Sequence, residues 1–200
     1  MTLGVVLAGG RGLRLGREEP KAQVVLAGRT LLVRARATLE ALVDVVVVSA
    51  PRDLALAVPD ASRVHDAASA EGPLAGLVAA LTSRPFTRAI VLAVDLPFAS
   101  VAALGALGEL LLPGDDAVLA APAGIPQPLA TWFAPSASGP LAAALAAGER
   151  SVTRAVLALR ARVLGPDVLV GMPEGEDAYF NLNTPADLAE AVRRCEEKQP

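Results

Sequence analysis

The sequence is poor in the residues that build disulfide frameworks, zinc sites and aromatic binding surfaces. Its 200 residues include one cysteine, one histidine and only 3% aromatic residues. Cys195 alone cannot form an internal disulfide, and with a single histidine it cannot complete a Cys/His zinc site. Few aromatic rings and a net charge of −3, with no basic stripe, also argue against a surface for nucleic acid. We therefore expect no nucleic-acid partner.

Long hydrophobic runs are absent as well. No stretch approaches the roughly 20 apolar residues that cross a membrane. The first apolar run, 3–7, is too short for a secretory signal peptide and is followed by glycines. We expect no membrane partner and a cytoplasmic location. The length favours one domain over residues 1–200, with a frayed tail at 196–200.

Apolar runs of strand length alternate with segments of helical length rich in alanine and leucine. This alternation predicts a Rossmann-like, doubly wound, mostly parallel sheet with helices on both faces. Because the alternation breaks in the second half, we expect one antiparallel strand. The expected strands are 3–7, 44–49, 63–65, 88–94, 117–121, 129–133 and 161–164, and the expected helices are 31–42, 53–57, 73–81, 101–112, 135–147, 151–159 and 185–197.

The first expected strand runs into a loop that combines glycines with cations. Gly9, Gly10, Gly12 and Gly16 alternate with Arg11 and Arg14, and Lys21 follows. Glycines let backbone N–H groups approach an anion closely, and cations neutralise it. The spacing matches neither the P-loop nor the dinucleotide fingerprint. Three cations also exceed what a dinucleotide pyrophosphate needs, so the loop favours a triphosphate or a phosphate that undergoes transfer.

Two aspartates come directly after expected strands. Asp66 follows the strand at 63–65, and Asp95 follows the strand at 88–94. Ligands of an open α/β sheet bind outside the carboxyl ends of its strands, so both carboxylates should share an edge with the glycine loop. One carboxylate at such a place can hold Mg²⁺, which keeps most of its ligands for water and phosphate. The alternative is that Asp95 only caps the turn before Pro97.

Two further segments have both a functional and a structural interpretation. Gly72–Gly76 is a helix start that can face a ligand with free N–H groups, or a tight turn that allows close packing. Asn181 and Asn183 are two residues apart in an extended segment, so their side chains point the same way. They can present amides to a ligand, or satisfy local backbone groups as asparagines in turns do.

These residues together resemble one known family, the molybdenum cofactor guanylyltransferases. The resemblance runs in chain order from Leu7 to Leu188. Its motifs are Leu-Ala-Gly-Gly-x-x-x-Arg-Leu-Gly from Leu7, then Lys21, Asp66, Gly-Pro-Leu-Ala-Gly from Gly72, Asp-Leu-Pro from Asp95, Gln-Pro-Leu from Gln127, Gly-Glu-Arg-Ser-Val from Gly148, and Phe-Asn-Leu-Asn-Thr-Pro-Ala-Asp-Leu from Phe180.

The resemblance implies a Mg²⁺-dependent transfer of GMP from GTP to the terminal phosphate of molybdopterin or the molybdenum cofactor, with release of pyrophosphate. It implies partners among the cofactor-synthesis proteins and the apo-molybdoenzymes. The residues it assigns are Leu7, Ala8, Gly9 and Gly10 against guanine and ribose, Arg14 and Lys21 against the triphosphate, Asp66 in the nucleotide pocket, Asp95 as the metal ligand, and Asn181 and Asn183 on the pterin side.

Other functions remain open at this point. The same fold can use CTP with molybdopterin, or GTP with a cobinamide or a sugar phosphate. A protein of this kind can also be a non-catalytic carrier of the dinucleotide cofactor.

Overall fold

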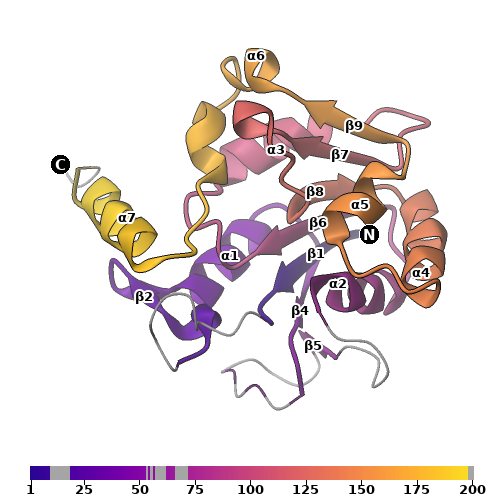
Figure 1. Cartoon of the computed structure of the whole chain (residues 1–200), viewed down its shortest axis with the longest axis horizontal. Coiled ribbons are helices and arrows are strands. Elements are labelled where there is room, and N and C mark those ends of the chain that lie inside the picture. The colour runs from indigo at the N-terminus through magenta and orange to yellow at the C-terminus, as the bar shows by residue number, and fades with distance from the viewer. Residues whose placement is uncertain (10–18, 53, 55, 57–61, 66–71, 198–200) are drawn as a thin grey trace.

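The computed structural model describes residues 1–9, 19–52, 54, 56, 62–65 and 72–197, and these form one central sheet with helices on both sides (Figure 1). The seven strands lie in the order β5-β4-β1-β6-β8-β7-β9. They are β1 (Thr2–Leu7), β4 (Val45–Ser49), β5 (Arg63–Val64), β6 (Arg88–Ala93), β7 (Ala117–Ala120), β8 (Ala130–Phe133) and β9 (Ala161–Leu164).

Only β8 runs against its neighbours in this sheet. It pairs antiparallel with both β6 and β7, whereas the other pairs are parallel. The expected mostly parallel sheet with one antiparallel strand is therefore confirmed. A small hairpin of β2 (Val25–Leu26) and β3 (Arg29–Thr30) stands apart from the sheet and was not expected.

The helices follow the expected alternation, although several boundaries differ. They are α1 (Leu31–Glu40), α2 (Pro73–Thr82), α3 (Val101–Glu109), α4 (Ser138–Ala146), α5 (Val152–Leu157), α6 (Pro166–Leu169) and α7 (Pro185–Glu197), with 3-10 turns η2 (Lys21–Gln23), η4 (Pro122–Gly124), η5 (Pro135–Ala137) and η6 (Gly175–Tyr179). No helix within the described part of the chain is long and apolar enough to span a membrane.

Two of the helix predictions need correction. Leu54 and Leu56, from the helix expected over 53–57, are not helical, and the rest of that prediction lies largely outside the described residues. The helix expected to reach Leu112 ends at Glu109. Leu110 already departs from helical geometry, with φ −92° and ψ 2°, and Pro113 disfavours helical geometry in Leu112.

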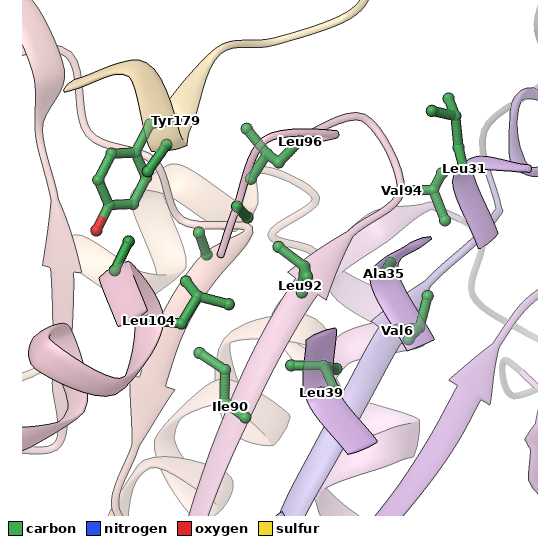
Figure 2. Packing of buried hydrophobic residues seen from close by; sticks show 14 of the residues in the cluster. Val6, Leu31, Ala35, Leu39, Ile90, Leu92, Val94, Leu96, Leu104 and Tyr179 are labelled. Atoms are coloured by element: carbon green, nitrogen blue, oxygen red, sulfur yellow. The ribbon is translucent and has the colours of Figure 1, made fainter. Parts of the chain in front are cut away.

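The sheet separates two apolar cores, since successive strand side chains point to opposite faces. Val6 and Ile90 belong to the core that α1 and α3 cover, and Figure 2 shows them with Leu39 and Leu104 from these helices. Val5 belongs to the other core, which includes residues of α2, α4 and α5. Both faces of β1 are thus buried, which is why its sequence is a continuous apolar run.

The strand register brings several strand ends to one edge of the sheet. Leu7, the last residue of β1, pairs with Ser49 and Ala93, and Ser49 pairs with Val64. We call this the carboxyl edge. Because β8 is antiparallel, it begins rather than ends here, with Ala130 opposite Leu92. The loop before β8 therefore reaches the same edge.

Candidate active site

The turn after β1 lies between the ends of two strands at the carboxyl edge. The N–H of Ala8 donates to the carbonyl of Ser49 at 2.9 Å, and the N–H of Val94 donates to the carbonyl of Leu7 at 3.2 Å. A Cβ on Gly9 would lie 3.2 Å from Cδ of Pro51, so glycine fits where a side chain would crowd the neighbouring loop. Gly9 is exposed, and its backbone is open to a ligand.

Lys21 lies at the centre of the site. It begins η2 and is only 8% exposed, yet its ammonium group reaches two distant segments. Nζ donates to Oδ1 of Asn183 at 2.8 Å and to Oδ2 of Asp95 at 3.3 Å. A buried ammonium group is stable only when acceptors surround it, and these two partners fix its position. The arrangement leaves a fixed positive charge at the carboxyl edge.

Asp95 follows β6 and is held from both its backbone and its side chain. Its carbonyl accepts from the N–H of Leu182 at 2.8 Å, which ties it to the segment before α7. Oδ1 of its carboxylate is buried without a hydrogen-bond partner in the described part of the protein. A buried carboxylate oxygen without a donor is costly unless a cation or a ligand group completes it.

Asn181 and Asn183 flank the fully buried Leu182 and reach different partners. Asn183 accepts from Lys21, and Nδ2 of Asn181 donates to Oε1 of Gln127 at 3.0 Å. Both amides thus lie at the carboxyl edge. The sequence analysis assigns Gln127 no role of its own, although this residue begins the Gln-Pro-Leu motif.

A capping arrangement at the start of α7 fixes the Asn183 backbone. Oδ2 of Asp187 accepts from the N–H groups of Asn183 at 2.8 Å and Thr184 at 2.7 Å, and Oγ1 of Thr184 accepts from the N–H of Asp187 at 3.2 Å. Burial alone would raise the pKa of the Asp187 carboxyl. The two backbone hydrogen bonds, the side-chain hydrogen bond with Thr184 and the positive charge of Lys21 outweigh burial, so the pKa is lowered overall. In the sequence, Thr184 and Asp187 have the Thr-x-x-Asp spacing of a capping box, and this spacing indicates the role of Asp187.

The structure brings together Lys21, Asp95 and Asn183 from three separate segments of the chain. Leu7, Ala8 and Gly9 lie at the same edge, and Asn181 lies beside Gln127. Three of the expected site residues, Gly10, Arg14 and Asp66, lie outside the described residues. The roles assigned to all of these residues remain predictions.

The fold, together with the comparisons with known proteins, places this α/β domain in the nucleotidyltransferase class. The family model of the MobA-like NTP transferase domain matches residues 4–163, which is most of the chain. The chain therefore belongs to the MobA-like NTP transferase family.

Relatives and a solved structure agree with this membership. The chain is 34% identical to a probable molybdenum cofactor guanylyltransferase of Chloroflexus aggregans, covering 94% of this chain and 92% of the relative. It is 36% identical to a probable molybdenum cofactor guanylyltransferase of Opitutus terrae, covering 92% and 91%. Molybdopterin-guanine dinucleotide biosynthesis protein A of Archaeoglobus fulgidus superposes with a TM-score of 0.79 at 27% identity, covering 98% of this chain and all of that one.

Proposed function

We propose that this protein transfers GMP from GTP to the terminal phosphate of molybdopterin or the molybdenum cofactor. The products are pyrophosphate and the guanine dinucleotide form of the cofactor. The observation that carries the proposal is the buried Lys21, held between Asp95 and Asn183 at the carboxyl edge of a domain of this family. The names of the relatives supply the choice of GTP and of the molybdenum cofactor.

The reaction is a displacement at the α-phosphorus of GTP. An oxygen of the acceptor's terminal phosphate forms the new bond to phosphorus, and the bond to the β-phosphate breaks with its electron pair leaving on pyrophosphate. The acceptor phosphate is already an anion, so the protein need not supply a nucleophile. It must hold two polyanions together and neutralise them. Lys21 does so at the α-phosphate, where negative charge gathers in the transition state.

Asp95 would hold Mg²⁺ through Oδ1, the buried oxygen that lacks a donor. The donor set fits this ion. No group of three or more His, Cys, Asp or Glu side chains is suited to a metal among the described residues, so water and substrate phosphates would supply the other ligands. A bound Mg²⁺ would neutralise charge on the triphosphate and the leaving pyrophosphate. Asp95 would hold the ion, and its carboxylate balances the charge of Lys21.

The remaining residues divide between the two substrates. The backbone of Leu7, Ala8 and Gly9 would contact guanine and ribose, together with Gly10, and Asp66 would complete the nucleotide pocket. Arg14 would add a second cation against the triphosphate. Asn181 and Asn183 would face the pterin. We expect the protein to act in the cytoplasm and its product to pass to apo-molybdoenzymes.

Pyrophosphate release tests this proposal. The purified protein is mixed with Mg²⁺, one nucleotide and one acceptor, and release is compared between GTP and CTP and between molybdopterin, cobinamide and a sugar phosphate. We expect release that requires both GTP and molybdopterin. Release no faster with molybdopterin than without it would contradict the proposal, and tight binding of the dinucleotide without turnover would indicate a carrier instead.

A further inference from the structure

Gln127 occupies a rigid place at the carboxyl edge that the proposed function has not used. Its N–H donates to the carbonyl of Ala120 at 2.8 Å, and its own carbonyl accepts from the N–H of Ala130 at 3.2 Å. It thus lies between the end of β7 and the start of β8. The reversed direction of β8 puts this loop beside β6, where the N–H of Ala93 donates to the carbonyl of Leu129 at 2.9 Å.

The contacts of Asn181 determine how both side-chain amides are turned. One end of the Asn181 amide lies 3.3 Å from the carbonyl oxygen of Tyr179, which can only accept, so this end is Nδ2. The same Nδ2 lies 3.0 Å from the Gln127 amide, so the Gln127 atom that faces it is the acceptor Oε1. Oδ1 of Asn181 and Nε2 of Gln127 are left without partners within the described part of the chain.

An acceptor and a donor on two adjacent amides suit a ring edge that presents N–H beside C=O. This lactam edge occurs in 2-amino-4-oxopyrimidine rings, which both pterin and guanine contain. We propose that Asn181 and Gln127 together recognise the lactam edge of the pterin ring of the acceptor, and that Gln127 is a specificity-determining residue. Oδ1 of Asn181 accepts from the ring N–H, and Nε2 of Gln127 donates to the ring carbonyl. This inference rests on the proposed function.

The strand order favours the pterin over guanine as the ring at this place. The turn at Ala8 and Gly9, proposed for guanine, lies beside β4 on one side of β1. Asp95 follows β6 on the other side of β1, and Gln127 lies further along, beside β8 and β7. Neighbouring strands are about 5 Å apart, so Asp95 separates the two ring sites. Guanosine stays attached to the α-phosphorus throughout the displacement, so the incoming pterin needs a place of its own, apart from guanine.

The substitution Gln127→Glu tests the inference, because it keeps the acceptor for Asn181 but replaces the donor with a carboxylate oxygen. We expect the KM for molybdopterin to rise by about 5- to 150-fold, the effect of leaving the ring carbonyl without a hydrogen-bond donor. The KM for GTP should stay within about 2-fold of the wild-type value, since residue 127 does not contact GTP in the proposed arrangement. The matched control is Thr82→Glu, which adds the same charge at an exposed position at the end of α2.

The two KM values show whether the amide pair binds the pterin ring or guanine. A rise in the KM for GTP instead of the acceptor would assign the amide pair to guanine and overturn the inference. An unchanged KM for both substrates would overturn it as well, and so would an equal effect of Thr82→Glu.

A binding measurement separates this inference from the proposed function. Free pterin is titrated with the wild-type protein and with Gln127→Glu, and binding is followed by pterin fluorescence. Weaker binding to the variant supports the amide pair even if no turnover is found. Equal binding, or no binding to either protein, overturns it, whereas turnover alone decides the proposed function.

Discussion

Nζ of Lys21 lies 3.3 Å from Oδ2 of Asp95, although 74 positions separate the two residues in the sequence. The side chains are 10% and 21% exposed, so both charges are largely removed from water. The pair joins the segment after the glycine loop to the end of β6. It puts a cation and a candidate metal ligand in contact before any substrate arrives.

Replacement of Lys21 should impair the reaction more than the fold. Lys21→Met keeps most of the side-chain volume but removes the charge. We expect kcat to fall by about 10²- to 10³-fold, as when one oriented donor to a developing charge is lost. Steady-state rates of pyrophosphate release measure this, with Arg36→Met on the surface of α1 as the control. An unchanged kcat would assign the neutralising role to another cation.

Asp95→Asn should strongly reduce Mg²⁺-dependent turnover while the protein stays folded, because the side-chain shape is retained and only the charge is lost. A fall of about 10²- to 10³-fold in kcat is expected, with weaker activation in a Mg²⁺ titration. Asp44→Asn is the control, since Asp44 accepts from the N–H of Thr2 at the opposite edge of the sheet. Near wild-type rates in Asp95→Asn would show that the metal is held elsewhere.

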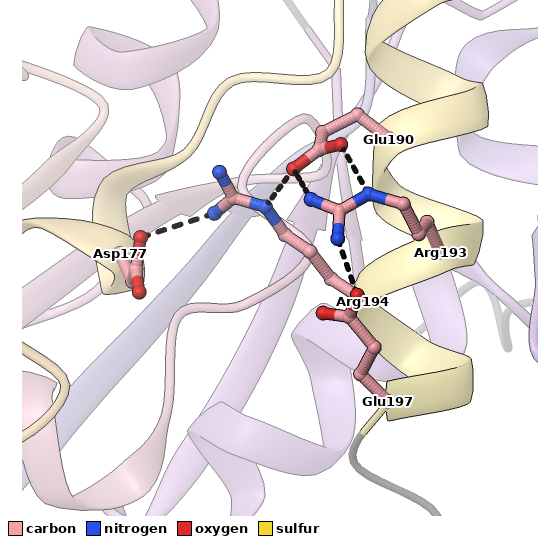
Figure 3. A network of polar contacts seen from close by, with 5 residues as sticks. All are labelled: Asp177, Glu190, Arg193, Arg194 and Glu197. Carbon is pink, nitrogen blue, oxygen red and sulfur yellow. Dashed lines mark hydrogen bonds and ion pairs between the residues drawn. The ribbon is translucent and has the colours of Figure 1, made fainter.

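Arg194 attaches α7 to the site, and its neighbour Arg193 provides a matched control (Figure 3). The Arg194 guanidinium lies 4.5 Å from the ring centroid of Phe180 and contacts Glu190 and Asp177. Arg193 pairs only with Glu190 and Glu197 within the described part of the chain.

Arg194→Met should therefore loosen the segment that carries Asn181 and Asn183. We expect the KM for the acceptor to rise by about 3- to 10-fold, in line with a loss of roughly 1 kcal/mol. Arg193→Met should change it by less than about 2-fold, because exposed ion pairs contribute little. Equal effects of the two substitutions would contradict an anchoring role for Arg194.

The ion pair of Asp116 with Arg160 should make the free energy of unfolding depend on pH. The hydrogen bonds from Arg160 outweigh burial, and with a bond from Ser136 they hold the pKa of the Asp116 carboxyl well below its usual range. Its ionised form therefore stabilises the fold above the unfolded pKa of about 3.9, and this contribution is lost as the pH falls further.

Urea unfolding between about pH 2 and pH 7 tests the Asp116 prediction. Asp116→Asn should lower the free energy of unfolding at pH 7 by about 1–3 kcal/mol. The variant should also lose less stability than the wild type as the pH falls. Glu197→Gln, in an exposed pair, is the control and should cost less than about 1 kcal/mol. Parallel pH profiles for wild type and Asp116→Asn would refute the assignment.

Alanine substitutions at two glycines of α3 should change the free energy of unfolding in opposite directions. A Cβ on Gly108 would lie 2.8 Å from Cε2 of Trp132, whereas a Cβ on Gly105 would meet Cδ2 of Leu42 at an ordinary 3.6 Å. Gly105→Ala should raise the free energy of unfolding by about 0.5–1 kcal/mol through helix propensity. Gly108→Ala should lower it by about 1–3 kcal/mol through overpacking. Stabilisation by both substitutions would contradict the packing described for Trp132.

The sequence predicts the sheet well because its signals there are local. The apolar runs of β1 and β6 are long enough to indicate strands buried on both faces, and Thr30 marks the start of α1 by accepting from the N–H of Val33. The β2–β3 hairpin escapes prediction because its strands have only two residues each and carry no periodicity.

Contacts within the site join residues that are far apart in the sequence, so no local pattern predicts them. Lys21 and Asn183 are 162 positions apart, and Asn181 and Gln127 are 54 apart, so no spacing rule connects them. The expected common edge for the ends of β1, β5 and β6 did follow from the sheet topology. What topology could not supply was which side chains meet across that edge.

Transfer of a labelled α-phosphate tests the central claim most directly. GTP labelled at the α-phosphorus and, separately, at the γ-phosphorus is incubated with the protein, Mg²⁺ and molybdopterin, and the products are separated. We expect the α-label in a pterin product that also contains guanine, and the γ-label in pyrophosphate. Retention of the α-label in GTP, or its release as free GMP with no label on the pterin, would contradict the proposed transfer.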